Sequence, residues 1–212
     1  MVKAIIFDLD NCLASAREPG EALFQPAFDA IRTAAGASFS QAALRSAFED
    51  IWSHPFDWVA ERHGFTPSMR EAGWRVFSSL EVSNPMHGYG DLEVLGRLPL
   101  RRFLVTSGFR RLQESKIRAL NLGLRLTGYY VDAIDEPGRL GKRALFERIL
   151  KQFELLPAEV LVLGDNPESE IAAGNALGIR TIQTLRPGVQ RSSAAAHHIA
   201  SLHELPALVA QG

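Results

Sequence analysis

Several short segments of the sequence are rich in apolar or β-branched residues, and each has the length of a strand and is separated from the next by a helical pattern. Four such segments lie at 2–7, 102–105, 160–163 and 180–184. Segments of this kind are typical of strands buried on both faces of a sheet, whereas a half-solvated strand alternates apolar and polar residues. They predict a sheet covered on both sides.

Helical periodicity lies between these segments. Apolar residues recur at helical spacing over 110–122 and 142–153, and two weaker candidate strands lie at 129–134 and 197–202. Alternation of strand and helix favours parallel pairing, because a parallel connection needs a crossover. The predicted class is α/β, with a Rossmann-like parallel sheet core flanked by helices.

The segment after the first strand has a different pattern, with consecutive helical repeats and no clear strand. It predicts an inserted all-helical domain at 15–85, leaving 1–14 and 86–212 as the sheet-bearing core. Asp91 is predicted to cap the helix that begins the return to the core. Four helices are predicted within the insertion, at 26–35, 40–53, 55–63 and 67–80.

Composition excludes several classes of function. The 212 residues suffice for one core with a smaller insertion, and 23 basic against 24 acidic residues leave a net charge of −1, without the footprint of a nucleic-acid or lipid-surface binder. The single cysteine, Cys12, excludes an intrachain disulfide. Asp8 and Asp10 interrupt the apolar start, so neither a signal peptide nor a membrane span is predicted. We expect a cytoplasmic protein, and no protein partner is indicated.

Polar residues follow three of the predicted strands. Asp8 and Asp10 follow the first, Thr106 and Ser107 follow the second, and Asp165 follows the segment at 160–163. Ligands of open parallel sheets bind beyond the carboxyl ends of the strands. The shared placement predicts a site there, although each residue alone is equally typical of a turn or a helix cap.

These residues belong to motifs that resemble those of the haloacid dehalogenase superfamily phosphatases. The sequence FDLDNCL at 7–13 resembles the Asp-x-Asp signature of that family. Thr106-Ser107-Gly108, Gly141-Lys142 and the acidic segment 164–170 resemble the second, third and fourth motifs, in the expected order. The resemblance extends from residue 3 to about 185 and is weakest inside the helical insertion, which would be the family's cap.

The resemblance implies a Mg²⁺-dependent aspartate nucleophile. Asp8 would attack phosphorus and form an aspartyl-phosphate, while Asp10 would serve as acid and then as base. The carboxylates and the phosphate repel one another, which calls for a hard cation with oxygen ligands. Asp8, Asp165 and the backbone carbonyl of Asp10 would bind Mg²⁺ directly, and Glu170 through a water molecule.

The resemblance also assigns the binding of the phosphate. Positive charge and backbone donors are needed for its oxygens. Arg143, where relatives often have proline, and Lys116 are possible substitutes for the lysine of the third motif. The residues assigned to the phosphate are Thr106, Ser107, Gly108 and Lys142.

The function predicted on this basis is hydrolysis of a small phosphorylated metabolite. A phosphoglucomutase-type phosphotransferase and a non-catalytic phosphate-binding relative remain alternatives. The dehalogenase branch is disfavoured because it lacks the second aspartate of the first motif, which is Asp10 here.

Other residues are assigned no site. The pair His197-His198 is predicted to be exposed, Cys12 to be a small buried group, and the oligomeric state stays open. Basic and aromatic residues of the insertion are candidates for substrate contacts, but packing or solvation explains them equally: Arg17, His54, Trp58, Arg62, His63, Arg70 and Trp74.

Overall fold

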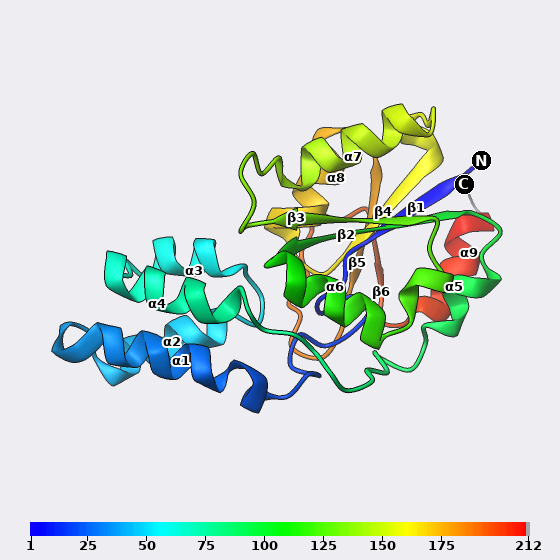
Figure 1. The fold of residues 1–212 in the computed structure, drawn as a ribbon. Coiled ribbons are helices and arrows are strands. Elements are labelled where there is room, and N and C mark those ends of the chain that lie inside the picture. The colour runs from blue at the N-terminus through cyan, green and yellow to red at the C-terminus, as the bar shows by residue number, and fades with distance from the viewer. Residues whose placement is uncertain (211–212) are drawn as a thin grey trace.

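A computed structural model describes residues 1–210, which form an α/β core and a helical extension (Figure 1). The core contains a six-stranded sheet in the order β3-β2-β1-β4-β5-β6, with every pairing parallel. This is a Rossmann-like strand order. The strands are β1 (Ala4–Phe7), β2 (Arg101–Gly108), β3 (Gly128–Ala133), β4 (Val160–Gly164), β5 (Arg180–Thr184) and β6 (His197–Ile199).

All six predicted strands are present, and two of them, β2 and β6, end three residues away from the predicted position. β2 continues through Gly108, so Thr106 and Ser107 lie within the strand and not after it, because β3 pairs alongside them as far as Ala133. β6 ends at Ile199, three residues early, since Ser201 caps the next short helix with its side chain.

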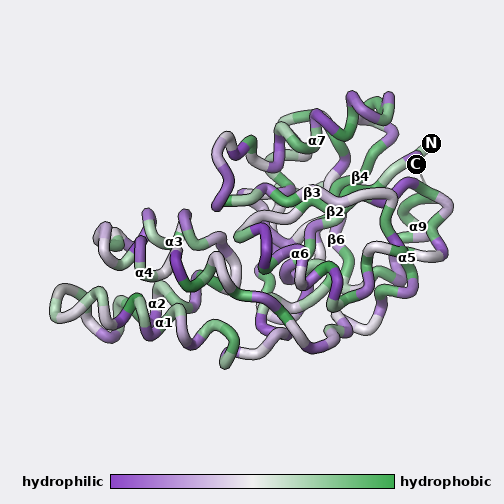
Figure 2. The backbone as a smooth tube through the Cα atoms, viewed as in Figure 1, coloured by the Kyte–Doolittle hydropathy of each residue, from purple (hydrophilic) through white to green (hydrophobic). Residues whose placement is uncertain are grey.

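Helices cover both faces of the sheet (Figure 1). One face carries α7 (Gly141–Gln152) and α8 (Ala172–Ala176), and the other carries α5 (Glu93–Arg97), α6 (Arg110–Ala119) and α9 (Leu205–Ala210). Successive residues of β1 enter the two cores in turn: Ile5 and Phe7 belong to one apolar cluster, and Ala4 and Ile6 to the other. The strands form a hydrophobic centre (Figure 2) because both of their faces are buried.

The predicted helical insertion is present as four helices beside the sheet: α1 (Glu21–Ala35), α2 (Gln41–Asp50), α3 (Phe56–Arg62) and α4 (Pro67–Phe77). α1 begins five residues before the predicted start and includes Pro26. A proline in the sixth position forfeits one backbone hydrogen bond, and burial of Phe24, Ala27, Phe28 and Ile31 along one helix face offsets that cost. Within residues 1–210, no helix has the length and apolar character needed to cross a bilayer.

The prediction that Asp91 caps a helix is wrong. α5 has no side-chain cap, and Asp91 instead forms a buried ion pair with Arg186, with 2.9 Å between Nη1 and Oδ2. Arg186 also donates to the carbonyls of Cys12 and Ala200. This arginine therefore joins the turn after β1 to the C-terminal segment, and its charge is fully compensated.

The prediction of exposed histidines is also wrong. His197 and His198 lie in β6 and are half-buried, because the strand packs along β5. The Nε2 atom of His198 lies 2.7 Å from the carbonyl oxygen of Ser192.

Candidate active site

The strand order places the site at the switch point between β1 and β4, where the direction in which the chain adds strands to the sheet reverses. β2 and β3 lie on one side of β1, while β4, β5 and β6 lie on the other. The crevice beyond the carboxyl ends of β1 and β4 is therefore the expected ligand position. Asp8 is the residue after β1 and Asp165 the residue after β4, so both border it.

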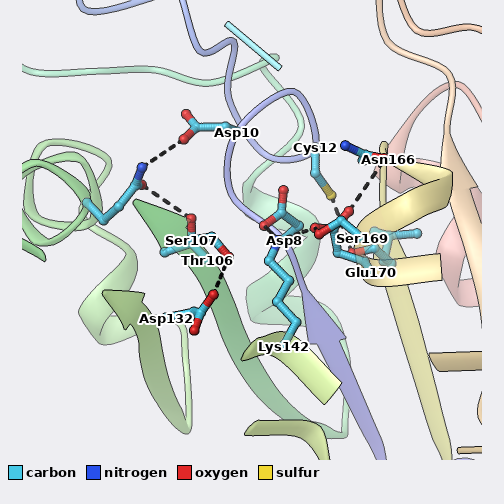
Figure 3. A network of polar contacts seen from close by, with 12 residues as sticks. Asp8, Asp10, Cys12, Thr106, Ser107, Asp132, Lys142, Asn166, Ser169 and Glu170 are labelled. Carbon is cyan, nitrogen blue, oxygen red and sulfur yellow. Dashed lines mark hydrogen bonds and ion pairs between the residues drawn. The ribbon is translucent and has the colours of Figure 1, made fainter. Parts of the chain in front are cut away.

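Lys142 joins two of the predicted acidic residues (Figure 3). It lies in the first turn of α7, and its Nζ atom is 2.7 Å from Oδ1 of Asp8 and also contacts Oε1 of Glu170. All three side chains are at most 8% exposed. The lysine of the third motif thus contacts the first aspartate of the first motif.

Glu170 packs closely against the end of β4 because residue 164 is a glycine. It lies in a π-helical segment, Pro167–Ile171, and accepts hydrogen bonds from Ser169 and from the backbone of Asn166. A side chain at Gly164 would put its Cβ 2.7 Å from the carboxylate oxygen Oε2 of Glu170. Only glycine at this position allows the approach.

Burial and the mutual repulsion of the carboxylates of Asp8, Asp165 and Glu170 raise the pKa values of two of them. Burial, then the charge of Glu170, raises the pKa of Asp8 to about 7. Burial, then the charges of Glu170 and Asp8, raises the pKa of Asp165 to about 8. Burial alone would lower the pKa of Lys142, but Asp8 and Glu170 raise it above its usual value. One ammonium group therefore does not compensate three carboxylates.

The cluster has the donor set of a hard-cation site. Asp8, Asp165 and Glu170 each offer a carboxylate oxygen, and the three atoms lie within 4.8 Å of one another. Oxygen ligands of this kind suit a small divalent cation, and its charge would remove the repulsion that raises the two pKa values. These residues fit a metal ion.

Asp10 faces away from this cluster, toward α6 (Figure 3). Its two carboxylate oxygens lie 2.7 and 2.8 Å from Nζ of Lys116, and Gln113 donates to one of them. Lys116 thus pairs with Asp10 and is no substitute for Lys142. Arg143 is none either, because it is exposed and its guanidinium pairs with Glu147 on its own helix.

Three of the four predicted phosphate-binding residues, Thr106, Ser107 and Gly108, lie at the end of β2. The hydroxyl of buried Thr106 donates to Gln113, and the hydroxyl of Ser107 donates to Asp132 over 3.1 Å. Gly108 has φ of 144°, a backbone conformation that favours glycine. This strand end therefore lies between the Asp10 network and Asp132.

Asp132 is a site residue that the sequence analysis missed. It is buried near the end of β3 and accepts hydrogen bonds from Ser107, from the backbone of Gly141 and from Arg139. It thereby fixes the end of β2 relative to the start of α7, which carries Lys142. A single acid inside the apolar segment 129–134 was the available signal.

A cavity of about 650 Å³ lies between the helical insertion and the core. Asp8, Lys142 and Asp165 line it from the core side. Phe109, directly after β2, joins the core to the insertion, with its ring centroid 5.1 Å from Trp74 and 5.8 Å from Phe77.

The candidate contact residues of the insertion divide into two groups. His54 and Trp58 stack with ring centroids 3.8 Å apart and line the cavity, while Arg17 and Arg62 line a neighbouring cavity of about 1210 Å³. The others make packing or hydrogen-bond contacts: His63 with Asp50 and Arg70 with the Phe65 carbonyl inside the insertion, and Trp74 with Phe109 of the core.

The fold and the site together define an α/β enzyme with an acidic, lysine-linked centre at the sheet's switch point. Residues 2–178 match the family model of the haloacid dehalogenase-like hydrolases. The chain belongs to this family of hydrolases.

The individual proteins that resemble the chain share only a low sequence identity with it. The chain is 24% identical to an enolase-phosphatase E1 of Aquifex aeolicus over 231 aligned positions, covering 91% of this chain and 94% of that protein. The crystal structure of a HAD phosphatase from Thermococcus onnurineus superposes with a TM-score of 0.65, at 20% identity and 98% coverage of both chains. An L-2-haloacid dehalogenase from Xanthobacter autotrophicus gives a TM-score of 0.61 at 16% identity and 99% coverage of both chains. These structural likenesses concern the fold alone.

Proposed function

We propose that this protein is a Mg²⁺-dependent phosphomonoester hydrolase that acts on a small phosphorylated metabolite through an aspartyl-phosphate. The observation that carries the proposal is the cluster of Asp8, Asp165, Glu170 and Lys142 at the switch point of the sheet. Mg²⁺ would be held by Asp8, Asp165 and the Asp10 carbonyl, with Glu170 acting through a water molecule. Bound there, it would offset the negative charge of the carboxylates and the phosphate.

In the first step, a carboxylate oxygen of Asp8 attacks phosphorus and the bond from phosphorus to the ester oxygen breaks. The departing alkoxide takes a proton from Asp10, which serves as the general acid. In the second step, a water molecule gives a proton to Asp10 and attacks the same phosphorus. The bond to Asp8 breaks and inorganic phosphate leaves. Thr106, the Ser107 and Gly108 backbone, and Lys142 would hold the phosphoryl oxygens.

A sequence relative supports the phosphatase assignment over dehalogenation. The protein from Aquifex aeolicus is named an enolase-phosphatase. Asp10, anchored between Lys116 and Gln113, supplies the second acidic group that the phosphatase reaction needs.

The test is phosphate release from 4-nitrophenyl phosphate. We expect turnover with Mg²⁺, loss of at least about 100-fold with EDTA, and recovery when Mg²⁺ is added back, because the carboxylate cluster repels the substrate without a cation. Equal release with Mg²⁺ and with EDTA would refute the metal-dependent reaction. Transfer of phosphate to an added sugar phosphate, with no free phosphate formed, would favour the phosphotransferase.

We also propose that 15–85 acts as a cap on a catalytic core formed by 1–14 and 86–212. Its support is Arg139, whose guanidinium pairs with Asp57 of α3 and, over 2.8 Å, with Asp132 of the core. This one side chain joins the insertion to the residue that orders the phosphate-binding strand end.

Replacement of Arg139 by glutamine should therefore raise KM by about 10-fold, with a smaller effect on kcat, since closure of the cap contributes binding energy. Steady-state kinetics on 4-nitrophenyl phosphate measures both. Arg148→Gln is the matched control, because Arg148 is exposed on α7 and lines neither cavity. Identical KM values for the two variants would contradict the role of Arg139.

A further inference from the structure

The cavity above the acidic cluster contains an excess of negative charge. Eight acidic side chains line it, against four lysine or arginine side chains. His54 does not restore the balance, because burial lowers its pKa and favours the neutral ring. A single divalent cation would compensate only half of the excess.

Each of the four basic side chains already has an acidic partner within residues 1–210. The pairs are Lys142 with Asp8 and Glu170, Lys116 with Asp10, Arg139 with Asp132 and Asp57, and Arg143 with Glu147. Lys142 is in addition the residue proposed to hold the transferred phosphoryl group. The lining therefore offers no spare lysine or arginine for a second anionic group on a substrate.

The wall formed by α3 is both acidic and apolar. Asp57 and Glu61 line the cavity from this helix, and Oδ1 of Asp57 is buried and accepts no hydrogen bond from the described residues. Phe56 and Phe109 line the same cavity and pack against each other, with ring centroids 6.2 Å apart. A leaving group that contacts this wall meets carboxylates, which accept from hydroxyl groups and repel anions, and aromatic rings, which favour carbon.

We infer that the cavity selects phosphomonoesters with an uncharged, hydroxylated or apolar leaving group, and discriminates against those that carry a second anionic group. Glu61 is a specificity-determining residue in this selection. The inference rests on the proposed function and names its substrate class.

A second anionic group of the substrate could instead be bound in the neighbouring cavity of about 1210 Å³. Arg17 there is paired with Glu21 and Glu49, but Arg62 also lines it, and a substrate long enough to reach Arg62 would gain a partner for an anionic group. A preference for anionic esters that is lost in Arg62→Gln would assign the selection to that cavity and overturn the inference.

The experiment compares glycerol 3-phosphate with 3-phosphoglycerate, which share a three-carbon chain and differ in a hydroxymethyl or carboxylate group. We expect kcat/KM to be at least about 10-fold higher for glycerol 3-phosphate, since like charges at short range oppose binding. Glu61→Gln should reduce this ratio by about 3-fold, and added salt should reduce it in the wild type, because a surface charge is screened. Glu71→Gln, an exposed position on α4 outside both cavities, should leave the ratio unchanged.

A binding measurement provides a readout independent of turnover. With Mg²⁺ and the Asp8→Asn variant, isothermal calorimetry should show tighter binding of glycerol 3-phosphate than of 3-phosphoglycerate. Equal or reversed preference in both assays, with 4-nitrophenyl phosphate still hydrolysed, would overturn the inference alone. If no ester is hydrolysed, 4-nitrophenyl phosphate included, the proposed function fails and the inference fails with it.

Discussion

Replacement of Asp8 by asparagine should lower kcat for 4-nitrophenyl phosphate by at least about 10⁴-fold, because an amide cannot act as the nucleophile that splits the displacement into two steps. The variant should still fold. Asparagine has nearly the same shape, and removing a carboxylate from a cluster that raises the pKa of Asp8 to about 7 relieves repulsion. Its melting temperature should equal or exceed that of the wild type, measured with EDTA.

Asp29→Asn is the matched control for this variant. Asp29 is exposed on α1, and the same substitution there should leave kcat unchanged. More than a tenth of wild-type kcat in Asp8→Asn, with Asp29→Asn normal, would contradict Asp8 as the nucleophile.

Replacement of Lys142 by methionine should affect both stability and activity. Removing one partner from a buried ion pair costs about 3–5 kcal/mol, because the remaining charges stay buried without compensation. Lys142 compensates both Asp8 and Glu170, each of which is at most 7% exposed. We therefore expect a clear loss in the free energy of unfolding without metal, partly recovered by Mg²⁺, and a loss of about 10²- to 10³-fold in kcat/KM.

Urea denaturation with EDTA or Mg²⁺, together with steady-state kinetics, measures these effects. Lys151→Met is the control, because Lys151 is exposed near the end of the same helix and should tolerate methionine. Unfolding free energies that agree between Lys142→Met and the control would show that the buried ammonium does not hold the carboxylates together.

Lys116 supplies a contrast to Lys142. Both are buried lysines that pair with a carboxylate of the first motif, but Lys116 holds Asp10 and Lys142 holds Asp8. From the sequence, Lys116 was a possible substitute for Lys142. They lie on helices that cover opposite faces of the sheet, α6 and α7, and would support acid-base chemistry and nucleophilic attack separately.

Local sequence patterns were sufficient for the α/β class, for the strands and for the helical insertion. Burial on both faces requires apolar or β-branched residues in β1 and β4, and the 3.6-residue period marks α6 and α7, so this information lies within short stretches of chain. The positions of Asp8 and Asp165 beyond the carboxyl ends of their strands were predictable for the same reason.

The pairings within the site required the tertiary structure. The contact of Lys116 with Asp10 joins residues 106 positions apart, and that of Lys142 with Asp8 joins residues 134 apart. Nothing local distinguishes these lysines from solvated ones, and Asp91 has the same local pattern as a helix cap although it pairs with Arg186. The motifs in the sequence were enough to propose most residues of the candidate site, although not Asp132. Their partners were decided only when the parallel sheet brought distant strand ends to one edge, because hydrogen bonds and ion pairs depend on distance in space and not along the chain.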